Sequence, residues 1–445
     1  MRTMRGALTL ALAAVGLLGC SEEILGAGEV KLEAGLESTV WPDPPPNRVN
    51  ITTTSEDGTT HDFKEFDGPV DGFSLGLGDL ARFHLRASDA QGQTLVSGDS
   101  ILIDPRGVAE RVVPLVVGRA GKLGRVDQLG DSFNTPVEFS GTIASRYLFS
   151  VSGREGRLYD LGLWRASDAF EVPCPSETDC KVETVFVHQG WTAVFIGPSG
   201  ASYLDFTTGD SGFLKDLEGG TYANVSGGQV ITGPDDETYV VGGTRTSSPS
   251  DRVLRVEADN TLSVIRLAAA RQGAAAAYLP GRGLLVVGGS ADAAGAEQLK
   301  PGADAFDTLD LPSDATSGAA IFEASAGIIR VGGSFGDAPA EMLRLDLGCA
   351  APCSAETAGP ALDSKDPVQL QTTESGDILL LSSDNASNGA LYRVVAENLP
   401  VTLEPLSATE RTPGLLSLLP TGQVALTGGS SGGSPSTLLE IYFQR

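Results

Sequence analysis

Histidine is the scarcest chemistry-bearing residue in this chain of 445 residues, with only His61, His84 and His188 present. A Ser–His–Asp hydrolase needs a histidine within reach of a serine. His188 instead ends the apolar run Val185-Phe-Val-His188, which is typical of a core strand. The segment Gly197-Pro-Ser-Gly200 also lacks the G-x-S-x-G spacing of a nucleophile elbow. The sequence therefore predicts no catalytic residue, no metal site and no cofactor.

Basic residues, long apolar runs and aromatic residues are also in short supply. The chain has 31 Lys and Arg against 57 Asp and Glu, a formal net charge of −26. Such a charge repels nucleic acid and anionic lipid, so we expect no nucleic-acid partner. No apolar run reaches the length of about 18 residues that a membrane-spanning helix needs. Aromatic residues make up 6% of the chain, which disfavours a site that stacks sugars on aromatic rings.

The first 20 residues are typical of an export signal. Two arginines precede an apolar stretch from Gly6 to Gly19, and Cys20 follows it. Leu17-Leu18-Gly19-Cys20 resembles a bacterial lipobox, in which the cysteine is acylated and becomes the mature N-terminus. The resemblance implies a lipoprotein signal peptide over 1–19, lipidation (palmitate) at Cys20 and a tether over 20–28. Ser21 after the cysteine implies the outer membrane of a Gram-negative envelope; an ordinary signal peptide is the alternative.

The other four cysteines form two close pairs, Cys174 with Cys180 and Cys349 with Cys353. Four cysteines allow three connectivities. The short separations and an oxidising compartment favour two local disulfides. A metal site is the competing interpretation, but neither spacing is C-x2-C and histidine is too rare to complete it.

Residues 29–118 are predicted to form a first domain. Their short runs alternate apolar and polar residues, as in Val49 and Ile51 or Phe83 and Leu85, which is the period of half-buried strands. Turn sequences such as Pro44-Pro45-Pro46 separate the runs. We expect a small β-sandwich, immunoglobulin-like or transthyretin-like.

Residues 119–445 carry an internal repeat, a short apolar run that ends in a glycine pair. Clear copies are Gly242-Gly243, Gly288-Gly289, Gly332-Gly333 and Gly428-Gly429, and degraded copies are Ser152-Gly153, Ile196-Gly197 and Ser382-Ser383. The second positions are 44, 46, 46, 44, 50 and 46 residues apart. A repeat of this length with four short strands is typical of a β-propeller blade. Seven copies predict an all-β fold with seven blades; six or eight are the alternatives, since the unit at Ser382-Ser383 is weak.

These repeats resemble the kelch family over about 120–445. The best unit runs from Leu418 to Gly429, with Leu439-Glu-Ile-Tyr-Phe443 as its next strand. The family's spaced Tyr and Trp are mostly missing. The resemblance implies a kelch-like β-propeller and says little about activity. Copper oxidases on this scaffold need two histidines, and the repeat region holds one.

The repeat pattern also predicts how the ring closes and which loops share a face. The last unit lacks a fourth strand, which residues 124–129 could supply. Loops after second strands share one face with the connections between blades. Candidate binding residues on that face are Arg245, Asp292, Asp337, Asp384 and Asn385. Both cysteine pairs are predicted after third strands, on the opposite face.

Two functions remain open from the sequence. The first is a non-enzymatic cell-envelope lipoprotein, anchored to the membrane by its acyl group, whose propeller binds or scaffolds an envelope protein or glycan. The second is a glycan-active hydrolase or lyase that uses carboxylates in the propeller channel. Acids and aromatics clustered at one channel mouth would favour the enzyme, and small apolar residues would disfavour it.

Overall fold

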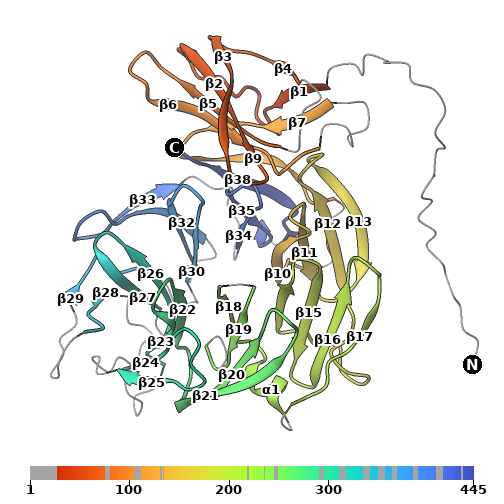
Figure 1. The fold of residues 1–445 in the computed structure, drawn as a ribbon, viewed down its shortest axis with the longest axis vertical. Coiled ribbons are helices and arrows are strands. Elements are labelled where there is room, and N and C mark those ends of the chain that lie inside the picture. The colour runs from red at the N-terminus through yellow and green to blue at the C-terminus, as the bar shows by residue number, and fades with distance from the viewer. Residues whose placement is uncertain are drawn as a thin grey trace, which may run out of the picture.

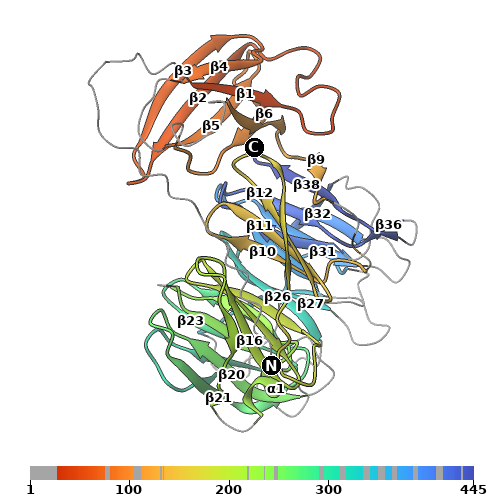
Figure 2. The same ribbon diagram turned by 90° about the vertical axis from the view of Figure 1, so that its right-hand side faces the viewer.

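The molecule consists of a small two-sheet unit beside a ring of sheets (Figures 1 and 2). The computed structural model describes residues 28–75, 81–104, 112–130, 133, 135–217, 220–234, 236–244, 249–289, 295–309, 317–333, 341–348, 356–362, 368–383, 389–406, 414–431 and 434–445. The predicted signal peptide, Cys20 and most of the tether lie outside these residues. The regular secondary structure of the described residues is strand, apart from one short helix, α1 (Thr221–Val225).

The N-terminal unit is built from two sheets that share one core. One sheet has the order β4 (Gly72–Leu75), β1 (Gly28–Glu33), β7 (Val112–Val116). The other has the order β3 (Thr60–Asp67), β2 (Arg48–Ser55), β5 (Ala81–Ser88), β6 (Thr94–Asp99), β8 (Gly118–Arg119). Alternate residues of β5 are buried, as the sequence pattern predicts. Three rings, Phe63, Phe73 and Phe83, lie 6.0–6.1 Å apart at the centre.

The rest of the described chain forms seven four-stranded sheets. Six of them are continuous in sequence, from the innermost strand outward. They are β10 (Phe139–Ile143), β11 (Tyr147–Ser152), β12 (Glu155–Asp160), β13 (Arg165–Glu171); β14 (Thr184–His188), β15 (Thr192–Gly197), β16 (Gly200–Asp205), β17 (Ser211–Phe213); β18 (Gln229–Thr232), β19 (Thr238–Val241), β20 (Ser250–Val256), β21 (Leu262–Arg271); β22 (Ala275–Leu279), β23 (Gly283–Val287), β24 (Ala296–Leu299), β25 (Asp307–Leu309); β26 (Ser317–Ala324), β27 (Gly327–Gly333), β28 (Met342–Leu345), β29 (Glu356–Thr357); and β30 (Gln369–Thr372), β31 (Ile378–Ser383), β32 (Gly389–Val395), β33 (Thr402–Leu406).

The seventh sheet joins the two ends of the ring. Its order is β34 (Leu415–Leu418), β35 (Val424–Thr427), β38 (Leu438–Phe443), β9 (Lys122–Gln128). The antiparallel pairing of β9 with β38 confirms that the outermost strand comes from the start of the repeat region. Each innermost strand contacts the innermost strands of both neighbouring sheets, so the ring is closed. This arrangement is a β-propeller. A two-stranded hairpin, β36 (Ser430–Ser431) with β37 (Ser434–Pro435), lies within the last sheet's connection.

The second strands are largely apolar because sheets pack against both of their faces. Every residue of β19 and of β23 is buried. The glycine pair then lets the connection between sheets pass close by: Gly243 has φ 73°, and a Cβ there would lie 2.0 Å from the Arg271 carbonyl oxygen. One predicted pair is out by a residue. Glu138 N donates to Val151 O and Glu183 N donates to Ile196 O, so the second unit's pair is Gly197-Pro198.

The disulfide between Cys174 and Cys180 is formed, as predicted. Its position after a third strand was wrong: the bridge follows the fourth strand β13, in the connection to β14. Ser199 Oγ donates to Asp179 Oδ2 at 2.7 Å, so the bridged loop lies against the β15–β16 turn. The bridge is therefore on the face of the glycine-pair turns. Cys349 and Cys353 lie outside the described residues.

Candidate ligand-binding channel

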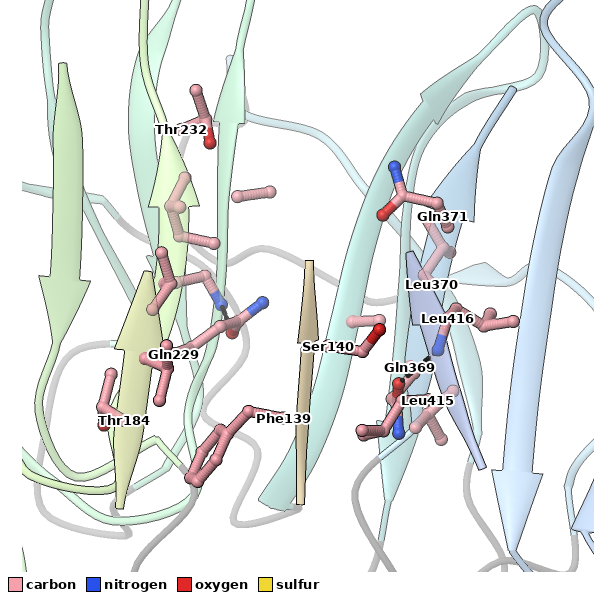
Figure 3. A pocket seen from close by; sticks show the side chains of 18 of the residues that line it. Phe139, Ser140, Thr184, Gln229, Thr232, Gln369, Leu370, Gln371, Leu415 and Leu416 are labelled. Atoms are coloured by element: carbon pink, nitrogen blue, oxygen red, sulfur yellow. Dashed lines mark hydrogen bonds between the residues drawn. The ribbon is translucent and has the colours of Figure 1, made fainter. Parts of the chain in front are cut away.

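The innermost strands of all seven sheets surround a cavity of about 530 Å³ at the ring centre (Figure 3). Its lining combines apolar residues, neutral polar residues and two glutamates. The apolar part is mainly Val, Ile, Leu and Ala, with one phenylalanine and one tyrosine. The neutral polar part is Ser140, Thr184, Gln229, Thr232, Gln369, Gln371 and Thr372. Among the described residues, no lysine, arginine, histidine or aspartate lines it.

Two carboxylates line the channel, Glu138 and Glu183, immediately before β10 and β14. Glu183 Oε1 lies 2.6 Å from Lys181 Nζ, and Glu183 Oε2 accepts a hydrogen bond from Ser226 Oγ at 2.6 Å. Burial alone would raise the pKa of Glu183, but the bonds from Lys181 and Ser226 outweigh it and lower the pKa. A glycosidase acid needs a raised pKa. Glu183 is therefore a stabilised carboxylate and a poor proton donor.

Two glutamines at equivalent register positions bridge neighbouring innermost strands (Figure 3). Gln229 pairs with Val241, and Gln369 pairs with Leu381. In each case the paired residue stands immediately before the glycine pair or its degraded copy. Gln369 uses its whole amide, because Oε1 accepts from Leu416 N at 3.1 Å and Nε2 donates to Gly414 O at 2.9 Å. Gln229 Oε1 accepts from Ala276 N at 3.2 Å. Its Nε2 group makes no hydrogen bond within the described part of the chain.

Several channel groups hold unused hydrogen-bonding capacity. The hydroxyls of Ser140 and Thr184 are buried without a hydrogen-bond partner in the described structure, and Thr184 is only 3% exposed. Gln371 follows Gln369 by two residues on β30, which is the period of a strand, and lines the same cavity (Figure 3). A buried polar group without a partner is unfavourable. These groups therefore suit a ligand that supplies hydrogen bonds and carries no charge.

His188 is buried at the end of β14, in the core position that its apolar run predicts. Burial lowers the pKa of His188, although Asp236 and Asn260 act in the opposite direction. No serine hydroxyl hydrogen-bonds to it among the residues that the structure describes. His84, in the N-terminal unit, bonds Asp99 at 2.8 Å through Nδ1. Neither histidine belongs to the channel.

The candidate loop residues cannot be placed. Arg245, Asp292, Asp337, Asp384 and Asn385 all lie outside the described residues. Within the described ranges, no group of three or more His, Cys, Asp or Glu could hold a metal ion, and no helix is long and apolar enough to cross a membrane. The channel glutamines were missed by the sequence reasoning. Their only signal was a glutamine as the first residue of an innermost strand, which has no meaning until the strands are paired.

No family model and no curated protein matches the chain. Solved structures give weak likenesses at the level of fold. A dihydro-heme d1 dehydrogenase in complex with DHE matches 93% of this chain and 79% of its own, at 10% identity and a TM-score of 0.43. The Cps50 (Swd1) β-propeller domain of Myceliophteria thermophila matches over 71% of this chain and 98% of its own, at 10% identity and a TM-score of 0.44.

The extracellular domain of a hybrid two-component system of B. thetaiotaomicron also matches, at 9% identity and a TM-score of 0.41. The match covers 72% of this chain and 40% of that chain. No ligand or activity is transferred from proteins this distant.

Proposed function

We propose that this protein is a non-catalytic binding module, whose seven-bladed, kelch-like propeller takes a neutral glycan or peptide segment into its central channel. The observation that carries this proposal is the channel lining. It offers the amides of Gln229 and Gln371, with apolar residues between them, and the buried hydroxyls of Ser140 and Thr184 belong to residues of the same lining. Pockets that combine apolar walls with a few polar groups are typical ligand sites. Neutral polyols and backbone amides match such groups without the desolvation of a charge.

Acylation at Cys20 would place this module at the envelope, in the outer membrane of a Gram-negative cell. The lipobox-like Leu17-Leu18-Gly19-Cys20 supports this proposal, and the disulfide is consistent with an oxidising compartment. An immunoglobulin-like or transthyretin-like sandwich would act as the spacer. Acyl labelling of cells that produce wild type and Cys20→Ser tests the anchor: label in wild type alone supports it, and label in neither contradicts it.

A glycan-active hydrolase or lyase has less support. The channel brings Glu138 and Glu183 into one cavity, but the pKa of Glu183 is lowered and no described aspartate, arginine or lysine lines the cavity with them. If the protein were such an enzyme, incubation with its glycan would yield cleaved products. Mass spectrometry of the glycans recovered after incubation distinguishes the two proposals, since a binding module returns them intact.

The binding proposal is tested by a variant that removes only unpartnered groups. Gln371→Ala with Thr184→Val deletes an amide and a hydroxyl that hold no described protein partner, so unfolding midpoints should stay near wild type. Each lost ligand hydrogen bond should weaken binding about 2- to 10-fold. The matched control is Gln128→Ala, an exposed glutamine of β9 outside the channel.

The measurement is binding of the full chain to arrays of neutral and acidic envelope glycans and of envelope-derived peptides. Retention of one neutral class by wild type and by the control, with loss in the channel variant, is the expected result. Equal retention by all three proteins would contradict the channel as the site. No retained glycan or peptide at all would contradict the binding function and leave a scaffold.

A further inference from the structure

A second hollow of about 380 Å³ lies where the N-terminal unit meets the closing sheet of the ring. It is lined by the loop from Ala34 to Val40, by Val117 to Arg119, by the first half of β9 and by Phe443. These segments come from both units and from both ends of the ring. The hollow therefore exists only when the junction is assembled.

The loop that forms one wall is fixed on the backbone of β9. Leu36 N donates to Arg125 O at 2.9 Å. Gly35 has φ 61°, and a Cβ there would lie 2.6 Å from Arg125 O. Only glycine allows this approach. The position of the wall is thus set by backbone contact and does not depend on long side chains.

The rim of the hollow is cationic. Arg119, Lys122 and Arg125 line it, and Glu37 is the one acid among the described residues that line it. Arg125 Nε donates to Glu37 Oε1 at 2.9 Å and its Nη2 donates to Oε2 at 3.2 Å. No carboxylate of the described chain lies within ion-pair distance of Arg119 or Lys122. Three cations against one anion leave a net positive hollow in a chain whose formal charge is −26.

The floor of the hollow is apolar. The ring of Phe443 lies against Gly118 and Gly124, where an added Cβ would be 2.3 and 2.8 Å from ring atoms. Val117 and Val126 are buried beside it. A cationic rim above an aromatic floor matches an anionic group carried on a small uncharged body. Arg and Lys together are the usual partners of phosphate oxygens.

We propose that this junction hollow is a binding site for a phosphate ester, held by Arg119 and Lys122 against the Arg125–Glu37 pair. Glycerol phosphate is the simplest such ligand, and the headgroup of an anionic phospholipid presents the same chemistry. The net positive charge of the rim neutralises the phosphate, and Phe443 lies under its carbon skeleton. Because the site spans both units, a bound phosphate ester also holds them together and stabilises the folded state.

The test is calorimetric titration of the full chain with glycerol phosphate at constant ionic strength. The variant is Arg119→Gln with Lys122→Gln, which leaves the Arg125–Glu37 pair in place. The matched control, Lys31→Gln with Arg48→Gln, removes two exposed cations of the N-terminal unit that lie outside the hollow. We expect saturable binding to wild type and control, a rise in their unfolding temperature, and at least tenfold weaker binding by the variant.

Cosedimentation with vesicles distinguishes the two sources of the phosphate. Vesicles of phosphatidylglycerol are compared with vesicles of phosphatidylcholine, using the chain without acylation. Binding to phosphatidylglycerol alone, lost in the Arg119/Lys122 variant, assigns the site to a lipid headgroup; calorimetric binding of glycerol phosphate assigns it to a free ester. The proposal is overturned if neither probe binds, or if variant and wild type bind equally. Neither result bears on the channel, which these substitutions do not touch.

Discussion

Of the Arg–Glu pairs that join parts of this molecule, two differ most clearly in burial. Arg271 of β21 and Glu297 of β24 connect two neighbouring sheets inside the ring, and both side chains are 0% exposed. Arg125 of β9 and Glu37 connect the ring to the N-terminal unit, with side chains 50% and 41% exposed. The same two side-chain types thus form one pair in the protein interior and another in contact with water.

The surroundings of the two pairs explain what each can do. Arg271 Nη1 also donates to Gly288 O at 2.6 Å, and Glu297 Oε2 accepts from Ala268 N at 2.5 Å. Buried charges therefore have a full set of partners, which desolvation demands. At the outer joint, where Arg125 and Glu37 connect the ring to the N-terminal unit, water can replace either side chain as a hydrogen-bond partner. Packing must therefore hold the two units together. The core cluster confirms this, since it runs without a break from Val30 and Leu85 to Ile441 and Phe443.

Breaking the buried pair should have the largest effect. Glu297→Gln leaves the Arg271 charge buried and should lower the free energy of unfolding by about 3–5 kcal/mol. Urea unfolding of the full chain measures it. The matched control is Glu37→Gln at the outer joint. Equal losses in the two variants would contradict the assignment of the difference to burial.

Removing the packing at the outer joint should come next. Phe443 is 2% exposed, and Phe443→Ala should cost about 3–5 kcal/mol through the lost burial and the cavity left behind. Phe213→Ala, at a ring that is 56% exposed, is the control and should change little. If Phe443→Ala unfolds the N-terminal unit separately from the ring, the midpoints followed by fluorescence and circular dichroism will differ.

A single hydrogen bond at the same joint should matter less. Ser97 Oγ donates to Gln444 O at 2.6 Å, and Ser97 is fully buried. Ser97→Ala leaves that carbonyl without its donor and should lower the free energy of unfolding by about 1–3 kcal/mol. Chemical denaturation measures the loss. An unchanged midpoint would show that this bond is replaced, for example by water.

The exposed pair should have the smallest effect. Hydrogen bonds from Arg125 lower the pKa of Glu37 below its ordinary value of 4.5, against the effect of burial. A depressed folded pKa adds stability above the ordinary value, and this stability is lost as pH falls through the folded pKa. Solvent and salt screen the pair, so Glu37→Gln should cost less than about 1 kcal/mol at neutral pH. Stability curves of wild type and variant should converge in acid, and divergence there would contradict this sign.

The repeat made most of the ring predictable. The second strands were recognisable in the sequence because packing on both faces favours largely apolar runs such as Leu284 to Val287. The closing strand followed from counting strands to the end of the last unit. The prediction placed Cys174 after a third strand because it missed the fourth strand β13. This strand is polar and gives no apolar signal, since five consecutive residues of its seven, Arg165 to Ala169, are exposed.

The two hollows were beyond the reach of the sequence for a physical reason. Gln229 and Gln371 belong to different sheets, and only ring closure brings their strands around one cavity. The junction hollow depends on Gly35 lying on the backbone of β9, about 90 residues further along the chain. Neither relation leaves a local pattern. The predicted loop residues, from Arg245 to Asn385, remain predictions.

The pairing of β9 with β38 also determines the order in which parts of the chain can fold. During synthesis the chain emerges from its N-terminus, so β9 is made early and has no partner until Leu438 to Phe443 appear. Contacts this distant in sequence form slowly. An unpaired strand edge on β9 would invite wrong partners in the meantime. The N-terminal unit can complete its own sheets before the ring is synthesised. We expect it to cover the free edge of β9 until β38 pairs with that strand.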